Sequence, residues 1–169
     1  MQMKRNRPIL KTEATSLDRI IEGVSWLVLL SLWVVVILKS SDLPDIIPTH
    51  FNAVGEVDDY SRKWLIFSLP GVATILAGIF NFISKHPDRL NYPVVITQEN
   101  ALRQYTLAVR MLRYLKLGII LIFSAIGIES VLIGLKMAHA FKPWLLPVLL
   151  AMVFLPIIVY FFSATKNRH

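Results

Sequence analysis

The chain has 169 residues, of which 55% are hydrophobic and only 17% are charged, and it contains no cysteine. A soluble domain of this size would carry more charge on its surface, and the lack of cysteine excludes disulfides, thiolate metal sites and cysteine nucleophiles. The formal net charge of +7 would suit nucleic-acid binding, but the placement of Lys and Arg along the chain gives it another explanation.

The apolar residues gather in four blocks. Crossing the hydrocarbon core of a bilayer, ~30 Å thick, takes about 20 mostly apolar residues in an α-helix. Four segments meet this requirement, at residues 20–38, 64–83, 117–135 and 144–162. We therefore predict an all-α integral membrane protein, a four-helix bundle whose membrane domain spans residues 20–162.

The basic segment 1–19 precedes the first apolar block, as it would in a signal peptide. No small-x-small cleavage site follows the block, where the chain reads VILKSSD, and the apolar run is longer than that of a signal peptide. The sequence therefore predicts an uncleaved first span with a basic N-terminal segment.

Lys and Arg are distributed unevenly between alternate sides of the predicted spans. Thirteen of the 18 lie in residues 1–19, 84–116 and 163–169, and five lie in residues 39–63 and 136–143. Since cytoplasmic loops are enriched in Lys and Arg, we predict a multi-pass protein of the bacterial cytoplasmic membrane. Both termini and the 84–116 connector would be cytoplasmic, and the 39–63 loop would be outside. This topology explains the positive charge, so we expect the lipid bilayer, and no nucleic acid, as a partner.

The outer loop contains PDIIPTHFNAVGEVDDYSRK at residues 44–63, rich in proline and acidic residues. Its prolines end the first helix and hold the chain extended. Asn52 and Gly55 occupy the first and last positions of a predicted type I turn. Asp58 or Asp59 is predicted to cap the second span. Much of the loop is therefore expected to be a rigid turn.

His50 and Glu56 are not explained by that turn, and one alternative is a metal site, because imidazole and carboxylate groups bind zinc and harder ions. Its candidate ligands are His50, Asp45, Glu56, Asp58 and Asp59. No closely spaced pair of histidines is present, and a site needs at least three converging ligands. One histidine and several acids also fall short of a nucleophile, a base and an oxyanion hole. We therefore expect no metal, no cofactor and no enzymatic activity.

The same loop carries a family resemblance. Ile47-Pro48-Thr49-His50-Phe51-Asn52, followed by Gly55, Asp58 and Lys63, resembles the IPxHFNxxGxxDxxxxK signature of bacterial membrane proteins in the domain of unknown function 1648. The connector segment NYPVVITQENALRQYTLAVRMLRYLKLGI resembles the second recurrent block of that family. Together the two resemblances cover residues 25–135.

This resemblance carries expectations about structure and function. The same domain forms the N-terminal part of SdpI-type immunity proteins, which protect a producer cell from its own secreted peptide toxin and can hold a repressor at the membrane. This sequence lacks the further spans of those proteins. The resemblance implies four spans and an ordered outer loop that acts as a recognition surface. Its candidate ligand-binding residues are Pro48, His50, Phe51, Asn52, Gly55, Asp58 and Lys63.

The cytoplasmic connector, residues 84–116, is predicted to contain an amphipathic helix from Gln98, with Thr97 as its N-cap. Arg103, Arg110 and Arg113 fall on one face of this helix. One interpretation is a helix that lies on the inner leaflet or docks a cytoplasmic regulator. The other is an extension of the third span whose arginines are solvated.

Glu129 is the one acid inside the third predicted span. Intramembrane carboxyl groups face protein or water, or are protonated. One interpretation is a polar pocket below the outer loop, formed with His50 or Lys136; the other is a side chain that reaches the interface or bonds to the backbone. His139 is expected to be an interface residue.

Three functions are consistent with the sequence. The preferred one is a non-enzymatic binding, sensing or immunity-type module that recognises an extracytoplasmic ligand such as a peptide. The alternative is a small transporter or channel subunit that uses Glu129, and a second alternative is a metal-dependent membrane enzyme. The oligomeric state and the ligand are left open.

Overall fold

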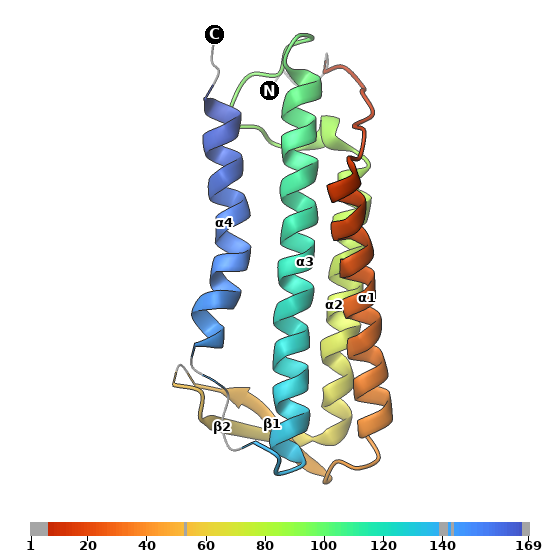
Figure 1. Cartoon of the computed structure of the whole chain (residues 1–169), viewed down its shortest axis with the longest axis vertical. Helices are drawn as coiled ribbons and strands as arrows, with labels where there is room; N and C mark the ends of the chain where they lie inside the picture. Colours follow the sequence, from red (N-terminus) through yellow and green to blue (C-terminus); the bar gives the residue numbers. More distant parts are fainter. Residues whose placement is uncertain (1–6, 53, 139–141, 143, 167–169) are drawn as a thin grey trace.

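A computed structural model describes residues 7–52, 54–138, 142 and 144–166. This part of the chain forms four long helices and one small β-hairpin (Figure 1). The elements in chain order are α1 (Ser16–Lys39), β1 (Ile46–Phe51), β2 (Val57–Arg62), η1 (Lys63–Phe67), α2 (Ser68–Ser84), η2 (Pro87–Arg89), α3 (Ala101–Gly134) and α4 (Leu145–Thr165). The prediction of a mainly α-helical four-helix protein is confirmed, with a two-stranded sheet added in the outer loop.

The start of α1 is fixed by a capping box. The Thr15 hydroxyl accepts a hydrogen bond from the Asp18 backbone N–H at 3.2 Å, and the Asp18 carboxylate accepts one from the Thr15 backbone N–H at 2.9 Å. This exchange satisfies N–H groups that the first turn of a helix leaves without intrahelical partners.

The connector does not form a separate surface helix. Residues 101–116 are the first half of α3, a single helix of 34 residues, roughly 50 Å long at 1.5 Å per residue. This length exceeds a hydrocarbon core of about 30 Å, so the interpretation as an extension of the third span is correct. The helix begins at Ala101 rather than Gln98, after a turn in which Thr97 and Asn100 exchange hydrogen bonds.

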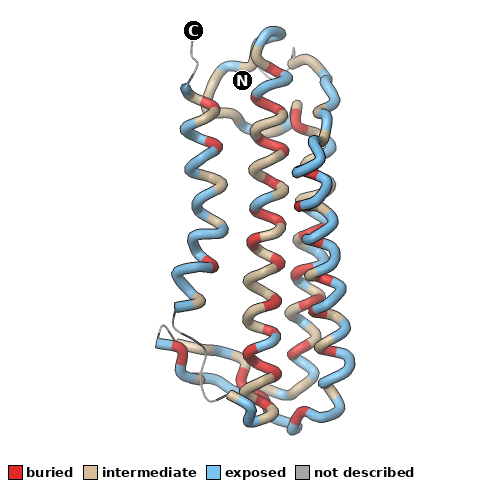
Figure 2. Tube along the Cα trace, in the orientation of Figure 1, coloured by how far each residue is buried: buried red, intermediate tan, exposed pale blue. Residues whose placement is uncertain are grey.

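α3 is the central element of the bundle. It packs against α1, α2, α4 and β1, whereas α4 packs chiefly against α3. Figure 2 shows buried positions along the length of α3 and few on α4. Glycine allows the close approach of α4, because a Cβ on Gly118 would lie 3.0 Å from the backbone oxygen of Met152.

Two apolar clusters hold α1, α2 and α3 together. One contains Leu29, Ala73, Ala77 and Ile120, where small residues on α2 let the helices come close. The other lies under the hairpin and joins it to the helices. Its buried members are Leu32, Val36, Leu43, Ile47, Ile66 and Val131. The hairpin is therefore part of the packed body.

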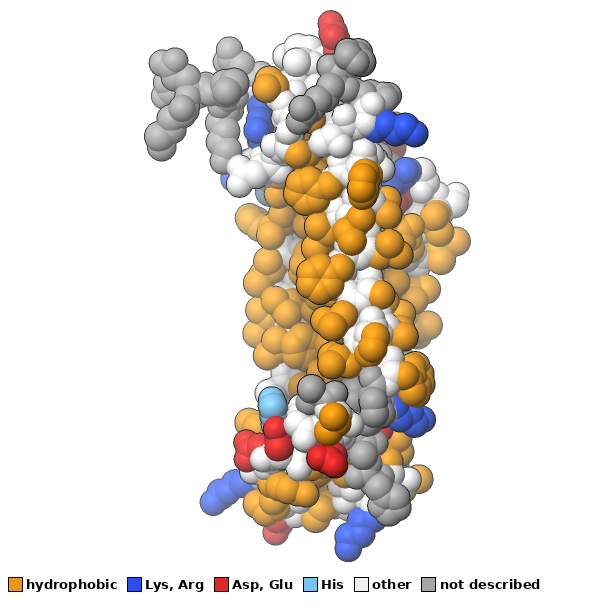
Figure 3. Space-filling model, turned by 90° about the vertical axis from the view of Figure 1, so that its left-hand side faces the viewer, with side chains coloured by type: hydrophobic (Ala, Val, Ile, Leu, Met, Phe, Trp, Pro, Cys, Tyr) orange, Lys and Arg blue, Asp and Glu red, His pale blue; other side chains and the backbone are white. Residues whose placement is uncertain are grey.

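The outer surface of the helices is apolar. Leu, Ile, Val and Phe side chains are exposed on α1, α2 and α4, and Figure 3 shows them as a band between two ends that carry the charged groups. In the described chain, α1, α3, α4 and the continuous helical segment of η1 and α2 (Lys63–Ser84) are long and apolar enough to cross a membrane. We call the end with β1, β2 and η1 the hairpin end, and the opposite end, where the termini lie (Figure 1), the termini end.

Candidate functional site

The hairpin closes at the turn predicted from the sequence. The Gly55 N–H donates to the Asn52 backbone oxygen at 2.9 Å, and the Asn52 side-chain oxygen accepts from the N–H groups of Val54 at 3.1 Å and Glu56 at 2.9 Å. Gly55 has φ = 87°, a conformation that favours glycine because it lacks a Cβ. Asn52 and Gly55 therefore have a structural task.

The base of the hairpin is fixed as well. Pro48 is buried, and Ile47 beside it is 0% exposed within the cluster under the hairpin. The Lys63 ammonium lies 3.3 Å from the Leu43 backbone oxygen and 3.3 Å from a carboxylate oxygen of Asp45. It thereby joins the exit of β2 to the entry of β1. Pro48 and Lys63, two of the predicted ligand-binding residues, therefore lie in the packed base of the hairpin.

The predicted cap of the second span is wrong. Asp58 and Asp59 lie within β2, and η1 and α2 begin without a side-chain cap. The Asp59 carboxylate accepts a hydrogen bond from the Tyr60 N–H at 2.8 Å.

His50 and Asp58 form a close polar pair on the exposed side of the hairpin. The imidazole Nδ1 lies 2.5 Å from a carboxylate oxygen of Asp58, and the two side chains are 68% and 42% exposed. The strand register is irregular on both sides of His50. Phe51 next to it is half-buried. This pair holds no part of the hairpin to the helices, so of the predicted residues it is the most accessible to a ligand.

The residues proposed for a metal site do not converge. Asp45 pairs with Lys63, and Glu56 accepts a hydrogen bond from the Asn52 side-chain amide at 3.2 Å. Among the residues that the structure describes, no group of three His, Asp or Glu side chains could hold an ion together. The metal-dependent enzyme therefore has no support from the hairpin geometry.

At the termini end, charged side chains meet inside the bundle. Asp18 of α1 is only 2% exposed, and its carboxylate lies 3.3 Å from Arg110 and 3.5 Å from Arg113 of α3. Arg103 donates to the Ser163 backbone oxygen of α4 at 2.7 Å. Arg110 and Arg113 of the predicted basic face therefore pair with α1, whereas Arg103 is exposed and bonds to α4.

One helical turn further along α3, Lys116 is 1% exposed. Its ammonium bonds to the Glu22 carboxylate of α1 and donates to the Asn81 side-chain oxygen of α2 at 2.7 Å. It also lies 5.6 Å from the centroid of the Trp26 ring. Pairing with a carboxylate and an amide offsets the cost of burying the amine. We call Asp18, Glu22, Asn81, Arg110, Arg113 and Lys116 the buried charge network.

The sequence reasoning missed this network, although a signal was present. Asp18 and Glu22 are four residues apart on one face of α1, and Arg113 and Lys116 are three apart on α3. Two acids on one face of the first span and two cations on one face of the third span are a pattern that could have indicated pairing between these helices.

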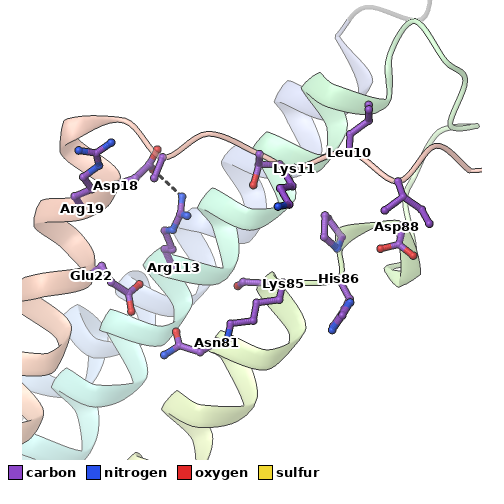
Figure 4. Close-up of a pocket in the computed structure, with 15 residues that line it drawn as sticks. Leu10, Lys11, Asp18, Arg19, Glu22, Asn81, Lys85, His86, Asp88 and Arg113 are labelled. Atoms are coloured by element: carbon purple, nitrogen blue, oxygen red, sulfur yellow. Dashed lines mark ion pairs between the residues drawn. The ribbon is translucent and has the colours of Figure 1, made fainter.

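An open pocket of about 840 Å³ lies beside the network, between the N-terminal segment 9–14, the start of α1, the end of α2 and α3. Figure 4 shows that charged residues from all four of these parts line it. Asp18 and Arg113 form its wall together with Glu22 and Asn81.

Glu129 does not form the predicted polar pocket. It is 7% exposed on α3, and one of its carboxylate oxygens has no hydrogen-bond partner. No ion pair with His50 or Lys136 is present in the described part of the chain, where Lys136 is exposed. His139 lies outside the described residues.

This fold defines a multi-pass membrane protein with a structured hairpin at one end. Residues 26–74, which include the hairpin, match the family model described as Domain of unknown function (DUF1648). The chain is also 25% identical over 142 residues to an uncharacterized protein of Archaeoglobus fulgidus, a match that covers 77% of this chain and 78% of the relative. No solved structure matches it.

Proposed function

We propose that the protein is a non-enzymatic binding module of the bacterial cytoplasmic membrane that recognises an extracytoplasmic ligand with its hairpin. Thirteen of the 18 Lys and Arg residues lie in the parts of the sequence that belong to the termini end, which favours that end as the cytoplasmic one. The hairpin end then faces outward, where a sensing or immunity-type protein would meet its ligand.

The exposed pair of His50 and Asp58 is the observation that carries this proposal. Most of the other signature residues that the structure describes have a structural task, in the turn or at the base of the hairpin. A rigid scaffold that presents an accessible pair of polar side chains is typical of a recognition surface, because a fixed geometry lowers the entropy lost on binding.

A basic peptide is the ligand class that fits this surface best. β2 has no second strand beside it in the described sheet, so a peptide can add to its edge through backbone hydrogen bonds. Asp45, Glu56, Asp58 and Asp59 outnumber Arg62 and Lys63 in the hairpin region, and Figure 3 shows acidic side chains gathered next to the histidine at this end. The excess of negative charge favours a cationic partner.

Binding of Lys- and Arg-rich peptides to the protein in nanodiscs tests this proposal. We expect His50→Ala and Asp58→Asn to weaken the tightest binding roughly tenfold, since loss of a charged hydrogen bond costs about 1.5–3 kcal/mol. Asp42→Asn is the matched control, because Asp42 is an exposed acid at the same end that pairs with Lys39 outside the hairpin. The proposal would be contradicted if basic peptides bound the native protein no more tightly than acidic peptides do. It would also be contradicted if the two variants bound basic peptides with the native affinity.

The orientation has its own test, which the lack of native cysteine makes simple. Val54 is 61% exposed at the hairpin turn, and we expect Val54→Cys to react with an impermeant thiol reagent on intact cells. Glu99→Cys at the opposite end is the control and should react only after lysis. The reverse pattern would place the hairpin in the cytoplasm.

A second candidate function is a small transporter or channel subunit. It is supported by Glu129, a buried carboxyl group with an unpartnered oxygen within an apolar helix. Acids in such places are often part of an ion or proton pathway.

A further inference from the structure

The pocket at the termini end has walls that are fixed by hydrogen bonds. The segment before α1 crosses this end of the bundle, where Arg7 donates to the backbone oxygens of Asp88 at 3.2 Å and Leu90 at 2.6 Å. The Tyr105 hydroxyl donates to the Pro8 backbone oxygen at 3.1 Å. The pocket therefore lies between elements that are tied to one another.

The acids that line this pocket are mostly matched by cations within the protein. Asp18 pairs with two arginines of α3, and Glu22 pairs with Lys116. The remaining acid of the lining, Asp88, is 25% exposed at its side chain and lies 4.0 Å from Arg89. Little of the negative charge is left to balance further cations.

Three cations of the lining have no such match. Lys11, Arg19 and Lys85 come from the N-terminal segment, α1 and the end of α2, and no ion pair involving them is found among the described residues. Figure 4 shows Lys11 and Lys85 on different chain segments that border the same pocket. His86 lies next to Lys85 in the lining. An excess of positive charge in a concave site attracts an anion.

We propose that this pocket binds the phosphate group of an anionic ligand, held by Lys11, Arg19 and Lys85. The ligand chemistry is a phosphate ester, supplied either by a phospholipid headgroup or by a soluble compound. The headgroup is favoured because the pocket is lined by the last residues of α2, an apolar span, and basic pockets at the ends of spans bind acidic lipids. Ile9, 87% exposed, and Leu10 beside it give a lipid chain apolar contacts.

Native mass spectrometry of the full chain in detergent tests the proposal with three probes: phosphatidylglycerol, phosphatidylcholine and glycerol phosphate. The test variant is Lys11→Gln with Lys85→Gln, which leaves the buried charge network intact. We expect phosphatidylglycerol to bind better than phosphatidylcholine and to bind this variant roughly tenfold more weakly. The control, Arg103→Gln with Lys166→Gln, removes two exposed cations of the termini end that neither line the pocket nor pair with an acid of its lining.

The outcomes separate the sources of the phosphate. If the pocket variant loses binding of phosphatidylglycerol but not of glycerol phosphate, the ligand is a lipid headgroup. If it loses binding of both compounds to the same extent, the ligand is a soluble phosphate ester. Equal binding of both phospholipids by the native chain overturns the proposal, because it shows no preference for an anionic headgroup. An equal effect of the two double variants also overturns it, because it shows general surface charge only. This site is separate from the hairpin, so its failure leaves the proposed function standing.

Discussion

At the scale of single residues, the buried polar groups divide into those with partners and those without. Lys116 and Asp18 are almost inaccessible, but each has at least two polar partners. Glu129 is nearly as buried and has an oxygen with none. A polar group buried without a partner is costly, and such costs are often retained where a residue has a function.

Glu129→Gln tests that interpretation. Burying an amide costs less free energy than burying a carboxylate. We therefore expect the free energy of unfolding to rise by about 1 kcal/mol, which is measured as a higher midpoint of thermal unfolding in detergent. If the protein conducts ions or protons, flux in reconstituted vesicles should be lost in the same variant. Ser124→Ala, which removes another unpartnered buried oxygen of α3, is the control and should leave any flux intact. A less stable variant with unchanged flux would show that Glu129 is structural.

At the scale of elements, the hairpin marks a limit of prediction from sequence. The Asn52–Gly55 turn could be predicted because its residue types are specific for it. The strands around it could not, because β1 contains Pro48 and β2 consists of VDDYSR, whose acids have low strand propensity. The strands form because Ile47 is buried against the helices, a contact that local sequence does not encode.

The contact of α4 with α3 leads to a prediction on glycine. Gly118→Ala would place a Cβ 3.0 Å from the Met152 backbone oxygen, so the two helices must move apart at a cost of about 1–3 kcal/mol. We expect a lower midpoint of thermal unfolding in detergent, followed by circular dichroism. Gly78→Ala is the matched control, since nothing lies within 4 Å of its added Cβ, and it should be neutral or stabilising. Equal effects of the two changes would show that the close approach is unimportant.

At the scale of the whole molecule, the four spans could be predicted because long apolar runs have few other uses. The buried charge network could not, since Glu22 and Lys116 are 94 positions apart and become neighbours only when α1 packs on α3. The face formed by Arg103, Arg110 and Arg113 could be predicted, and Arg103 is exposed on it, but the pairing of the other two arginines with a buried acid could not. The reason is that Asp18 lies across from Arg110 and Arg113 in the bundle.

A double-mutant cycle on Glu22 and Lys116 measures how strongly the network joins the helices. Glu22→Gln leaves a buried ammonium without its carboxylate, and we expect a loss of about 3 kcal/mol in the free energy of unfolding. Glu22→Gln combined with Lys116→Met should recover most of that loss, because no buried charge is left unpaired. Glu13→Gln, at an exposed acid before α1, is the control. Additive effects of the two substitutions would show that the pair is not coupled.

The peripheral position of α4 has a consequence for how such chains can change over evolutionary time. The hairpin packs on α1, η1 and α3, and no residue of α4 belongs to the described apolar cluster beneath it. Insertion, loss or exchange of spans after α3 would therefore leave the apolar contacts beneath the hairpin intact. The number of membrane-spanning helices after α3 can therefore change during evolution while the structure of the hairpin is kept.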